Sequence, residues 1–319
     1  MNRISPLLMG HDQIEQRFTE ALEQNRMHHA WLLFGMKGIG KRLLAERLAA
    51  YILCQTHTAC GECHGCKMMV MGSHPDLFRV SLLESKRDLN IEQVRQLLSF
   101  LSLSGSESAR RVVILDDAER LNNQAANALL KGLEEPSPGT LLLMVCSDME
   151  RLPATIRSRC MLQSCLPLPE KELSAVLDGM LSVEHSVADA TKSLAMALAD
   201  GCPGRVSCLQ DANIAKALLT WQNLIAQLER ADVGQVDNWI KQYVNLVPHT
   251  LIVQLLLEPV YKLLQKPRDQ NSFSSASALH QAAHQCARWP ADLLRSTLRP
   301  GPTLLASILT LRTAIKGCG

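Results

Sequence analysis

Four cysteines fall within a short stretch of this 319-residue chain, at Cys54, Cys60, Cys63 and Cys66. Thiolates at such spacings can surround one Zn²⁺ ion tetrahedrally, with Zn–S bonds of about 2.3 Å. Because four cysteines leave no open coordination position, the pattern predicts a structural zinc module over residues 54–66 rather than a catalytic metal site.

Three alternatives remain open for this cluster. His57 or His64 could replace one thiolate, and C-x2-C-x2-C spacing also begins iron–sulfur motifs. The cysteines could also be free thiols at the surface. No Cys-Pro pair follows at ferredoxin spacing directly after the cluster, and its fourth cysteine lies upstream, which favours zinc over an iron–sulfur cluster. The chain has 11 cysteines, and most of those outside the cluster lie in apolar stretches typical of small core residues.

A glycine-rich segment from Gly35 to Arg42 nearly matches the phosphate-binding loop G-x-x-x-x-G-K-[ST]. The glycines Gly35, Gly38 and Gly40 would let backbone N–H groups surround phosphate oxygens, and Lys41 would reach the β- and γ-phosphates. A glycine-rich turn with a chance lysine is the alternative. The apolar stretch before the loop and the amphipathic stretch after it favour the phosphate loop.

The last position of the loop departs from the motif. Arg42 stands where the hydroxyl of Ser or Thr would ligate Mg²⁺, and a guanidinium is a permanent cation without an acceptor atom. We expect Arg42 either to repel Mg²⁺ or to point away and leave a ligand missing. The sequence therefore predicts impaired metal-assisted hydrolysis and leaves open whether ATP binds at all.

An acidic pair follows an apolar stretch further along the chain. Asp116 would hold Mg²⁺ through water, and Asp117 stands where P-loop ATPases of the AAA+ type usually place a glutamate that positions the attacking water. Aspartate is one methylene shorter than glutamate, so the carboxylate of Asp117 is expected not to reach the attacking water. The alternative is a solvated end of a strand or the start of a helix.

Strand-like and helix-like patterns alternate around these motifs, which predicts an α/β fold: a parallel sheet with helices on both faces. Strands are predicted at 30–34, 77–80, 112–115, 141–145 and 161–163. After residue 166 the strand signals fade, and helices are predicted at 171–181, 187–199, 214–230, 236–247, 250–264, 276–288 and 303–316. We expect three domains, over residues 1–166, 167–211 and 212–319.

Composition excludes several classes of protein. The formal net charge is +2 and aromatic residues make up 4% of the chain, which argues against a free-standing nucleic-acid binder. No apolar run approaches the roughly 18 residues that a membrane span needs, and the N-terminus lacks the apolar region of a signal peptide. We expect a cytoplasmic protein without membrane contact.

Arg159 lies in a Ser-Arg-Cys segment just before the last predicted strand. An arginine at this position is most often a surface charge. In an AAA+ domain this edge faces the neighbouring subunit, where an arginine can stabilise charge on the neighbour's γ-phosphate, as an arginine finger does.

Together these motifs resemble the delta-prime family of bacterial DNA polymerase III clamp-loader subunits, which are AAA+ proteins. The resemblance covers about the first 210 residues. It rests on residues 28–33 before the phosphate loop, the cysteine module before His74-Pro75-Asp76, residues 126–136 after the acidic pair, and Ser158-Arg159-Cys160. It identifies Arg159 as an arginine finger and Arg205 as a candidate sensor-2 arginine. It also makes residues 167–211 a helical lid and 212–319 a collar that joins the subunits.

The resemblance implies a function. Such subunits sit in a five-membered AAA+ ring with a delta subunit and gamma/tau motor subunits, and the ring places the sliding clamp on primed DNA. The delta-prime member is rigid, does not hydrolyse ATP and lends its arginine to a neighbour. This chain would then work in the bacterial cytoplasm, with the nucleoid at replication forks, and have no ATPase activity of its own.

Two other functions remain open. An active motor ATPase of the same superfamily would need another group to replace the missing hydroxyl at Arg42 and the glutamate at Asp117. A zinc-stabilised nucleic-acid-binding module belongs to a different class, and the small net charge counts against it. The two departures favour the non-hydrolysing subunit.

Overall fold

The computed structural model describes residues 4–5, 7–83, 86–103, 110–181, 185–226, 228–265, 273–295 and 297–316. The chain divides into two compact units, Met1–Gly179 with Asp200–Arg205, and Met180–Ala199 with Val206–Gly319. The helix predicted at 171–181 belongs almost entirely to the first unit, whereas the helix predicted at 187–199 belongs to the second. The division into three domains stays a prediction.

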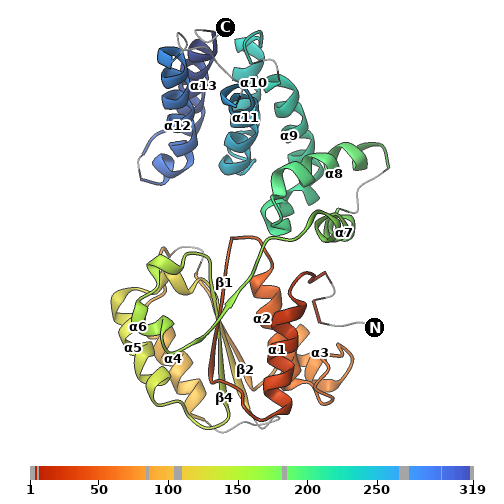
Figure 1. Ribbon diagram of the computed structural model, residues 1–319, viewed down its shortest axis with the longest axis vertical. Helices are drawn as coiled ribbons and strands as arrows, with labels where there is room; N and C mark the ends of the chain where they lie inside the picture. The colour runs from red at the N-terminus through yellow and green to blue at the C-terminus, as the bar shows by residue number, and fades with distance from the viewer. Residues whose placement is uncertain are drawn as a thin grey trace. The chain divides into compact units, whose positions relative to one another are not determined.

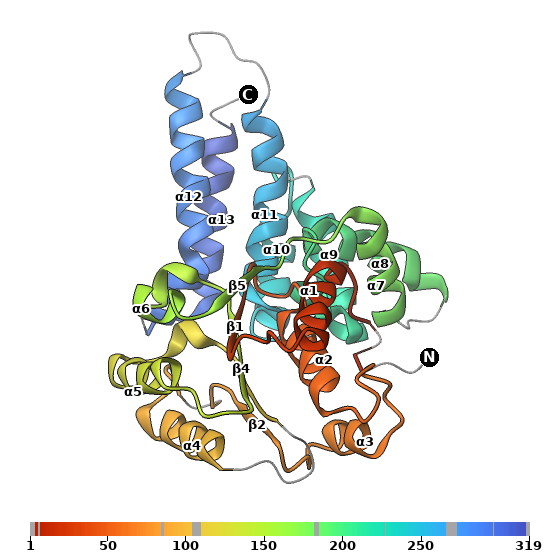
Figure 2. The same ribbon diagram turned by 60° about the horizontal axis from the view of Figure 1, so that its bottom comes forward.

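The first unit is built on a five-stranded parallel sheet in the order β2-β3-β4-β1-β5. Figures 1 and 2 show this sheet between the helices of the unit. Its strands are β1 (Ala30–Phe34), β2 (Leu77–Val80), β3 (Arg111–Leu115), β4 (Thr140–Cys146) and β5 (Met161–Ser164). Every residue of β3 is buried, as expected for a parallel strand with helices on both faces. The predicted parallel sheet is therefore confirmed.

Two groups of helices cover the two faces of this sheet (Figure 1). One face carries α1 (Asp12–Glu23), α2 (Lys41–Leu53) and α3 (His64–Val70), and the other carries α4 (Ile91–Ser102), α5 (Asn123–Glu134) and α6 (Ala154–Arg157). The helix α7 (Glu170–Met180) follows the sheet. Each face has its own core: Trp31 and Leu33 of β1 lie in one, and Ala30 and Leu32 in the other, because side chains alternate along a strand.

Two of these helices, α1 and α3, were not predicted from the sequence. The apolar residues Ile14 and Phe18 of α1 are buried one turn apart, so the signal was present in the chain. The helix α3 has only seven residues and begins inside the cysteine cluster, so its periodic pattern is too short to recognise. In contrast, α4 begins with a capping box formed by Asn90 and Gln93, a start signal that can be recognised in the sequence itself.

A buried ion pair joins α1 to α2. The Arg47 Nη1 atom lies 3.1 Å from Glu15 Oε1, and the Tyr51 hydroxyl donates to Glu15 Oε2 at 2.8 Å. Arg47 also donates to the backbone carbonyl oxygens of Ile4 and Ser5, so it holds the N-terminal segment against α2. Both charged residues are more than nine-tenths buried.

Replacing Arg47 with alanine is expected to lower the free energy of unfolding by about 3–5 kcal/mol, because Glu15 would be left as a buried charge without its counter-ion, with only the Tyr51 hydroxyl still bonded to it. Urea unfolding followed by circular dichroism would measure the change. The control is Arg95→Ala, which removes an exposed pair with Glu92 and should change stability by less than about 1 kcal/mol. Equal effects of both substitutions would contradict the prediction.

The regular elements of the second unit are all helices within its described residues. It contains α8 (His185–Ala199), α9 (Ala212–Ile225), α10 (Val233–Tyr243), α11 (His249–Leu264), α12 (Phe273–Arg295) and α13 (Pro300–Lys316). Its core includes stacked Trp221 and Trp239, whose indole N–H groups donate to the carbonyls of Ile252 and Ala217. In the described residues, no helix combines the length and apolar character that crossing a membrane requires.

Several helix boundaries in this unit differ from the sequence prediction, and the two largest differences are at helix ends. The helix predicted at 214–230 ends at Ile225, and Asp232 caps a new helix by accepting from the N–H of Gly234. The helix predicted at 276–288 continues to Arg295 and includes Pro290. A proline ends a helix less reliably than local rules suggest, because packing against neighbouring helices can compensate for the lost hydrogen bond.

Candidate functional site

The predicted phosphate loop and acidic pair lie at the same edge of the sheet. Gly35 follows β1, Asp116 follows β3, and Ser147 follows β4. Because all strands are parallel, their carboxyl ends meet at one edge, which is where ligands bind in open α/β sheets. The structure thus brings together the loop and the acidic pair, which are some 75 residues apart in sequence.

The glycines allow close backbone packing in the loop. A Cβ atom on Gly35 would lie 2.3 Å from the carbonyl oxygen of Cys165, and one on Gly38 would lie 2.7 Å from the backbone nitrogen of Arg205. The N–H of Gly204 donates to the carbonyl of Gly38 at 2.8 Å. The segment that carries the predicted sensor-2 arginine is therefore packed directly on the loop, and Arg205 faces Asp200 at 3.5 Å.

Lys41 opens α2 just after Gly40, and its side chain is turned into the loop. Its Nζ atom donates to the carbonyl oxygens of Gly35 and Met36, each at 2.8 Å. The residue is 5% exposed, and burial lowers the pKa of Lys41. A bound phosphate would have to compete with these two carbonyls for the ammonium group. The reach of Lys41 to a nucleotide stays a prediction.

Arg42 forms an ion pair with Asp116. Its Nη1 atom lies 3.0 Å from Asp116 Oδ2, across 74 positions of sequence. Of the two outcomes expected for Arg42, the guanidinium does not point away. It pairs with the carboxylate that would hold Mg²⁺ through water, so a fixed cation is placed where the metal's charge would be needed. The sequence did not reveal this pair, because it depends on the spacing of β1 and β3 in the sheet.

Asp117 lies in the left-handed backbone region, with φ +51°. Burial raises its pKa, and the nearby carboxylates of Asp116 and Glu119 raise it further. Glu119, which no sequence motif marks, accepts a hydrogen bond from the N–H of Ser147 at 3.1 Å. This contact joins the segment after β3 to the end of β4.

Arg159 lies away from this edge of the sheet. It precedes β5, so it belongs to the amino end of that strand, whereas the phosphate loop follows the carboxyl end of the parallel strand β1. The four residues of β5 extend about 13 Å, more than an arginine side chain spans. Arg159 therefore cannot serve a phosphate in its own chain's loop, but its partly exposed side chain is available to another molecule.

The four predicted metal ligands converge in the structure. Their sulfur atoms all lie within 4.8 Å of one another, with Cys54–Cys60, Cys54–Cys63 and Cys60–Cys66 distances of 3.6, 3.8 and 4.0 Å. A tetrahedron with Zn–S bonds of about 2.3 Å has edges of about 3.8 Å. The donor set therefore fits a single metal ion. A four-iron cluster would place its thiolates on different iron atoms and hence farther apart.

Backbone groups support this arrangement. The N–H groups of Cys63 and Cys66 point at the sulfur atoms of Cys60 and Cys63, each at 3.4 Å. Burial opposes ionisation of Cys54, but hydrogen bonds led by that of Thr56 lower its pKa to about 5. The Nδ1 atom of His57 lies 2.8 Å from the carbonyl oxygen of Tyr51, and neither His57 nor His64 belongs to the group of converging ligand atoms in the described residues. The cluster follows the 13 residues of α2, so about 20 Å separates it from the phosphate loop.

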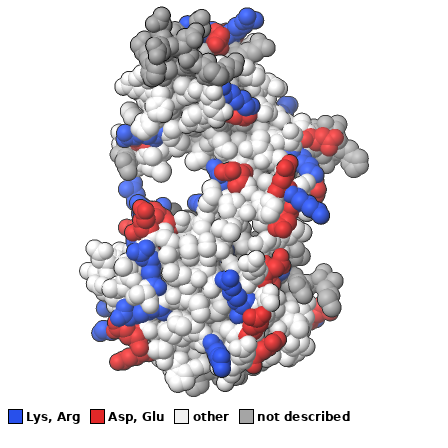
Figure 3. Space-filling view, in the orientation of Figure 1, with Lys and Arg blue, Asp and Glu red and all other residues white. Residues whose placement is uncertain are grey.

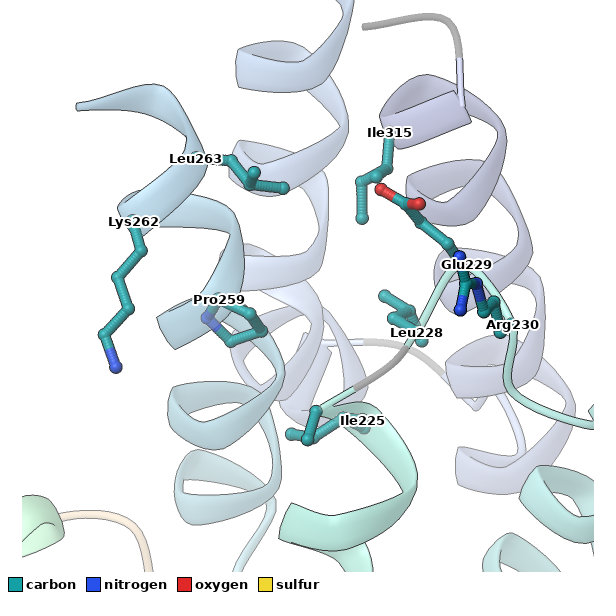
Figure 4. Close-up of a pocket in the computed structure, with 9 residues that line it drawn as sticks. Ile225, Leu228, Glu229, Arg230, Pro259, Lys262, Leu263 and Ile315 are labelled. Carbon is teal, nitrogen blue, oxygen red and sulfur yellow. The ribbon is translucent and has the colours of Figure 1, made fainter. Parts of the chain in front are cut away.

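A separate cavity of about 400 Å³ lies in the helical unit (Figure 4). Its walls come from the end of α9 and the segment that follows it, from α11 and from α13. They are mostly aliphatic, with Glu229 and Arg230 on one side, and the ammonium group of Lys262 extends away from the cavity. Lys262 pairs with Glu258 at 2.6 Å. A site that orients a substrate needs several polar groups that point at one place. The phosphate loop provides such groups better than this cavity does.

Comparisons with known proteins agree with these features. The family described as "DNA polymerase III, delta subunit" matches residues 10–168. The DNA polymerase III subunit delta' of Pseudomonas aeruginosa is 48% identical over 144 residues, which is 44% of either chain. The subunit delta' of Escherichia coli is 31% identical over 237 residues, covering 70% of this chain and 71% of that protein. The chain thus matches less than half the length of the first relative.

The fold also has a solved counterpart. The structure of a DNA polymerase III gamma subunit-related protein from Thermotoga maritima matches 95% of this chain and 99% of that protein, with a TM-score of 0.51 and 16% identity. This likeness supports the predicted AAA+ fold, an α/β unit followed by helices.

Proposed function

Because the chain belongs to the family of DNA polymerase III delta-prime subunits, we propose that it is a clamp-loader subunit that hydrolyses no ATP and supplies Arg159 to ATP held by a neighbour. The ion pair between Arg42 and Asp116 carries this proposal. It neutralises the carboxylate that a Mg²⁺ ion would need, beside a lysine already bonded to its own loop.

Unlike Arg42, which pairs with a residue of its own site, Arg159 is placed to act outside its own subunit. It is partly exposed and lies at the sheet edge away from its own loop, as an arginine that acts on another subunit must. A guanidinium at a neighbour's γ-phosphate would stabilise the charge that develops during phosphoryl transfer. Its partners would be gamma/tau motor subunits, a delta subunit, the sliding clamp and primed DNA, at replication forks in the bacterial cytoplasm.

Other parts of the chain support the same role. The four cysteines would hold a structural Zn²⁺ ion, which would fix the segment between α2 and β2 to the core of the first unit. Residues 167–211 would act as a lid whose Arg205 borders the phosphate loop, and residues 212–319 as the collar that joins the subunits.

The purified chain is expected to hydrolyse no ATP, and Arg42→Thr should strengthen Mg²⁺-ATP binding about tenfold, because it frees Asp116 and restores a hydroxyl ligand. Isothermal titration with and without Mg²⁺ would measure this. Arg42→Lys, which keeps the positive charge, is the control and should give no gain. ATP turnover by the unchanged chain at about 1 s⁻¹ or faster would contradict the proposal and favour a motor ATPase.

One face of the described surface counts against a nucleic-acid-binding module (Figure 3). On the face shown in Figure 3, basic and acidic side chains of the described residues lie interspersed rather than gathered into a basic stripe. A lone DNA-binding domain concentrates its positive charge on one face. Tight, salt-sensitive binding of DNA by the isolated chain would nevertheless favour that function over the one proposed.

A further inference from the structure

A second helix holds the side chain of Arg159. The Nη2 atom of Arg159 lies 2.8 Å from Glu134 Oε1, at the end of α5. Its Nη1 atom donates to the carbonyl oxygen of Thr155 and more weakly to the Ser158 hydroxyl, at 2.9 and 3.4 Å. The guanidinium is thus held from two sides, by its own helical turn and by α5.

Local helix stability does not explain Glu134. The helix α5 ends at this residue, and a carboxylate in the last turn opposes the helix dipole, whereas Lys131 in the same turn complements it. Glu134 is about half exposed and packs no core. Its ion pair with Arg159 is the interaction that offsets this unfavourable position.

The contacts leave part of the guanidinium available. The Nη2 atom pairs with Glu134, and Nη1 donates to the Thr155 carbonyl and the Ser158 hydroxyl. The Nε atom makes no hydrogen bond within the described part of the chain. A guanidinium has five N–H donors in a fixed plane. It can therefore keep its contact with Glu134 and still offer donors to phosphate oxygens.

We infer that Glu134 is the positioning residue for Arg159, an inference that rests on the proposed function. Its carboxylate restricts the rotamers of Arg159 before the subunits meet, so that the guanidinium is already oriented when it reaches the neighbour's phosphate. Ordering a long side chain beforehand lowers the entropic cost of the transition-state contact. Glu134 touches neither nucleotide nor metal and acts only through Arg159.

Glu134→Ala is expected to lower kcat at the neighbouring ATP site about tenfold and to leave KM for ATP unchanged, because the arginine is disordered but still present. Glu134→Gln should recover most of the rate, since an amide oxygen still accepts from a guanidinium. Glu135→Ala is the matched control: it removes the adjacent exposed carboxylate and should have no effect. The rates are measured in the reconstituted clamp loader, after native mass spectrometry confirms assembly.

A double-substitution cycle separates the possible outcomes. If Glu134 acts through Arg159, Glu134→Ala should change nothing further in an Arg159→Ala loader. The inference would be overturned if Glu134→Ala slowed hydrolysis further in the Arg159→Ala loader. It would also be overturned if Glu134→Ala alone left the rate unchanged or raised it. If Arg159→Ala itself leaves the rate unchanged, the proposed finger fails and the inference fails with it.

Discussion

Arg159→Ala is expected to slow ATP hydrolysis at the neighbouring motor site about 10³-fold, the lower end of the effect of losing an arginine finger. The loss should appear in kcat, because the guanidinium stabilises charge that develops in the transition state. Assembly should be unaffected, since Arg159 is partly exposed and its contacts are confined to Glu134 and the preceding turn.

The measurement needs a clamp loader in which only the motor site that receives Arg159 hydrolyses ATP. In a ring with several motors the total rate falls only by the share of the site that receives Arg159. The other motor sites should therefore carry inactivating changes in their phosphate loops. Arg151→Ala removes an exposed arginine just before α6 and is the matched control, which should leave the rate unchanged. An unchanged rate for Arg159→Ala would remove the finger assignment.

Cys66→Ser is expected to abolish metal binding and to lower the stability of the first unit by about 3–5 kcal/mol. Structural zinc contributes about 10–16 kcal/mol in isolated zinc-finger peptides, but here α2 and the sheet keep their own core. Cys66 is fully buried against that core, so the loss should extend to α3. Native mass spectrometry should find one Zn²⁺ ion on the unchanged chain and none on the variant, and thermal unfolding would give the change in Tm.

Cys208→Ser is the control, because this half-buried cysteine lies outside the cluster and should retain the zinc. Removing the metal from the unchanged chain with a chelator should reproduce the loss of stability. Iron in place of zinc would contradict the identity of the metal. A chain that is equally stable without any metal would contradict its structural role.

Much of the site could be predicted because its parts are continuous in the chain. The phosphate loop from Gly35 to Lys41 and the cysteines from Cys54 to Cys66 are local patterns, and the glycines and thiols in them are required by backbone and metal geometry. The buried strands that position them are equally local, since unbroken apolar runs such as β3 are typical of parallel sheets.

The tertiary structure decided which charges meet. Arg42 could be recognised as a defect in the loop, but its pairing with Asp116 follows from the strand order, which places the segment after β3 two strands away from the loop. The contact of Glu134 with Arg159 likewise depends on how α5 packs beside α6. Sequence alone thus determined the chemical groups and the elements that carry them. Only the fold decided their ion pairs, because side-chain contacts between distant segments depend on packing and not on local pattern.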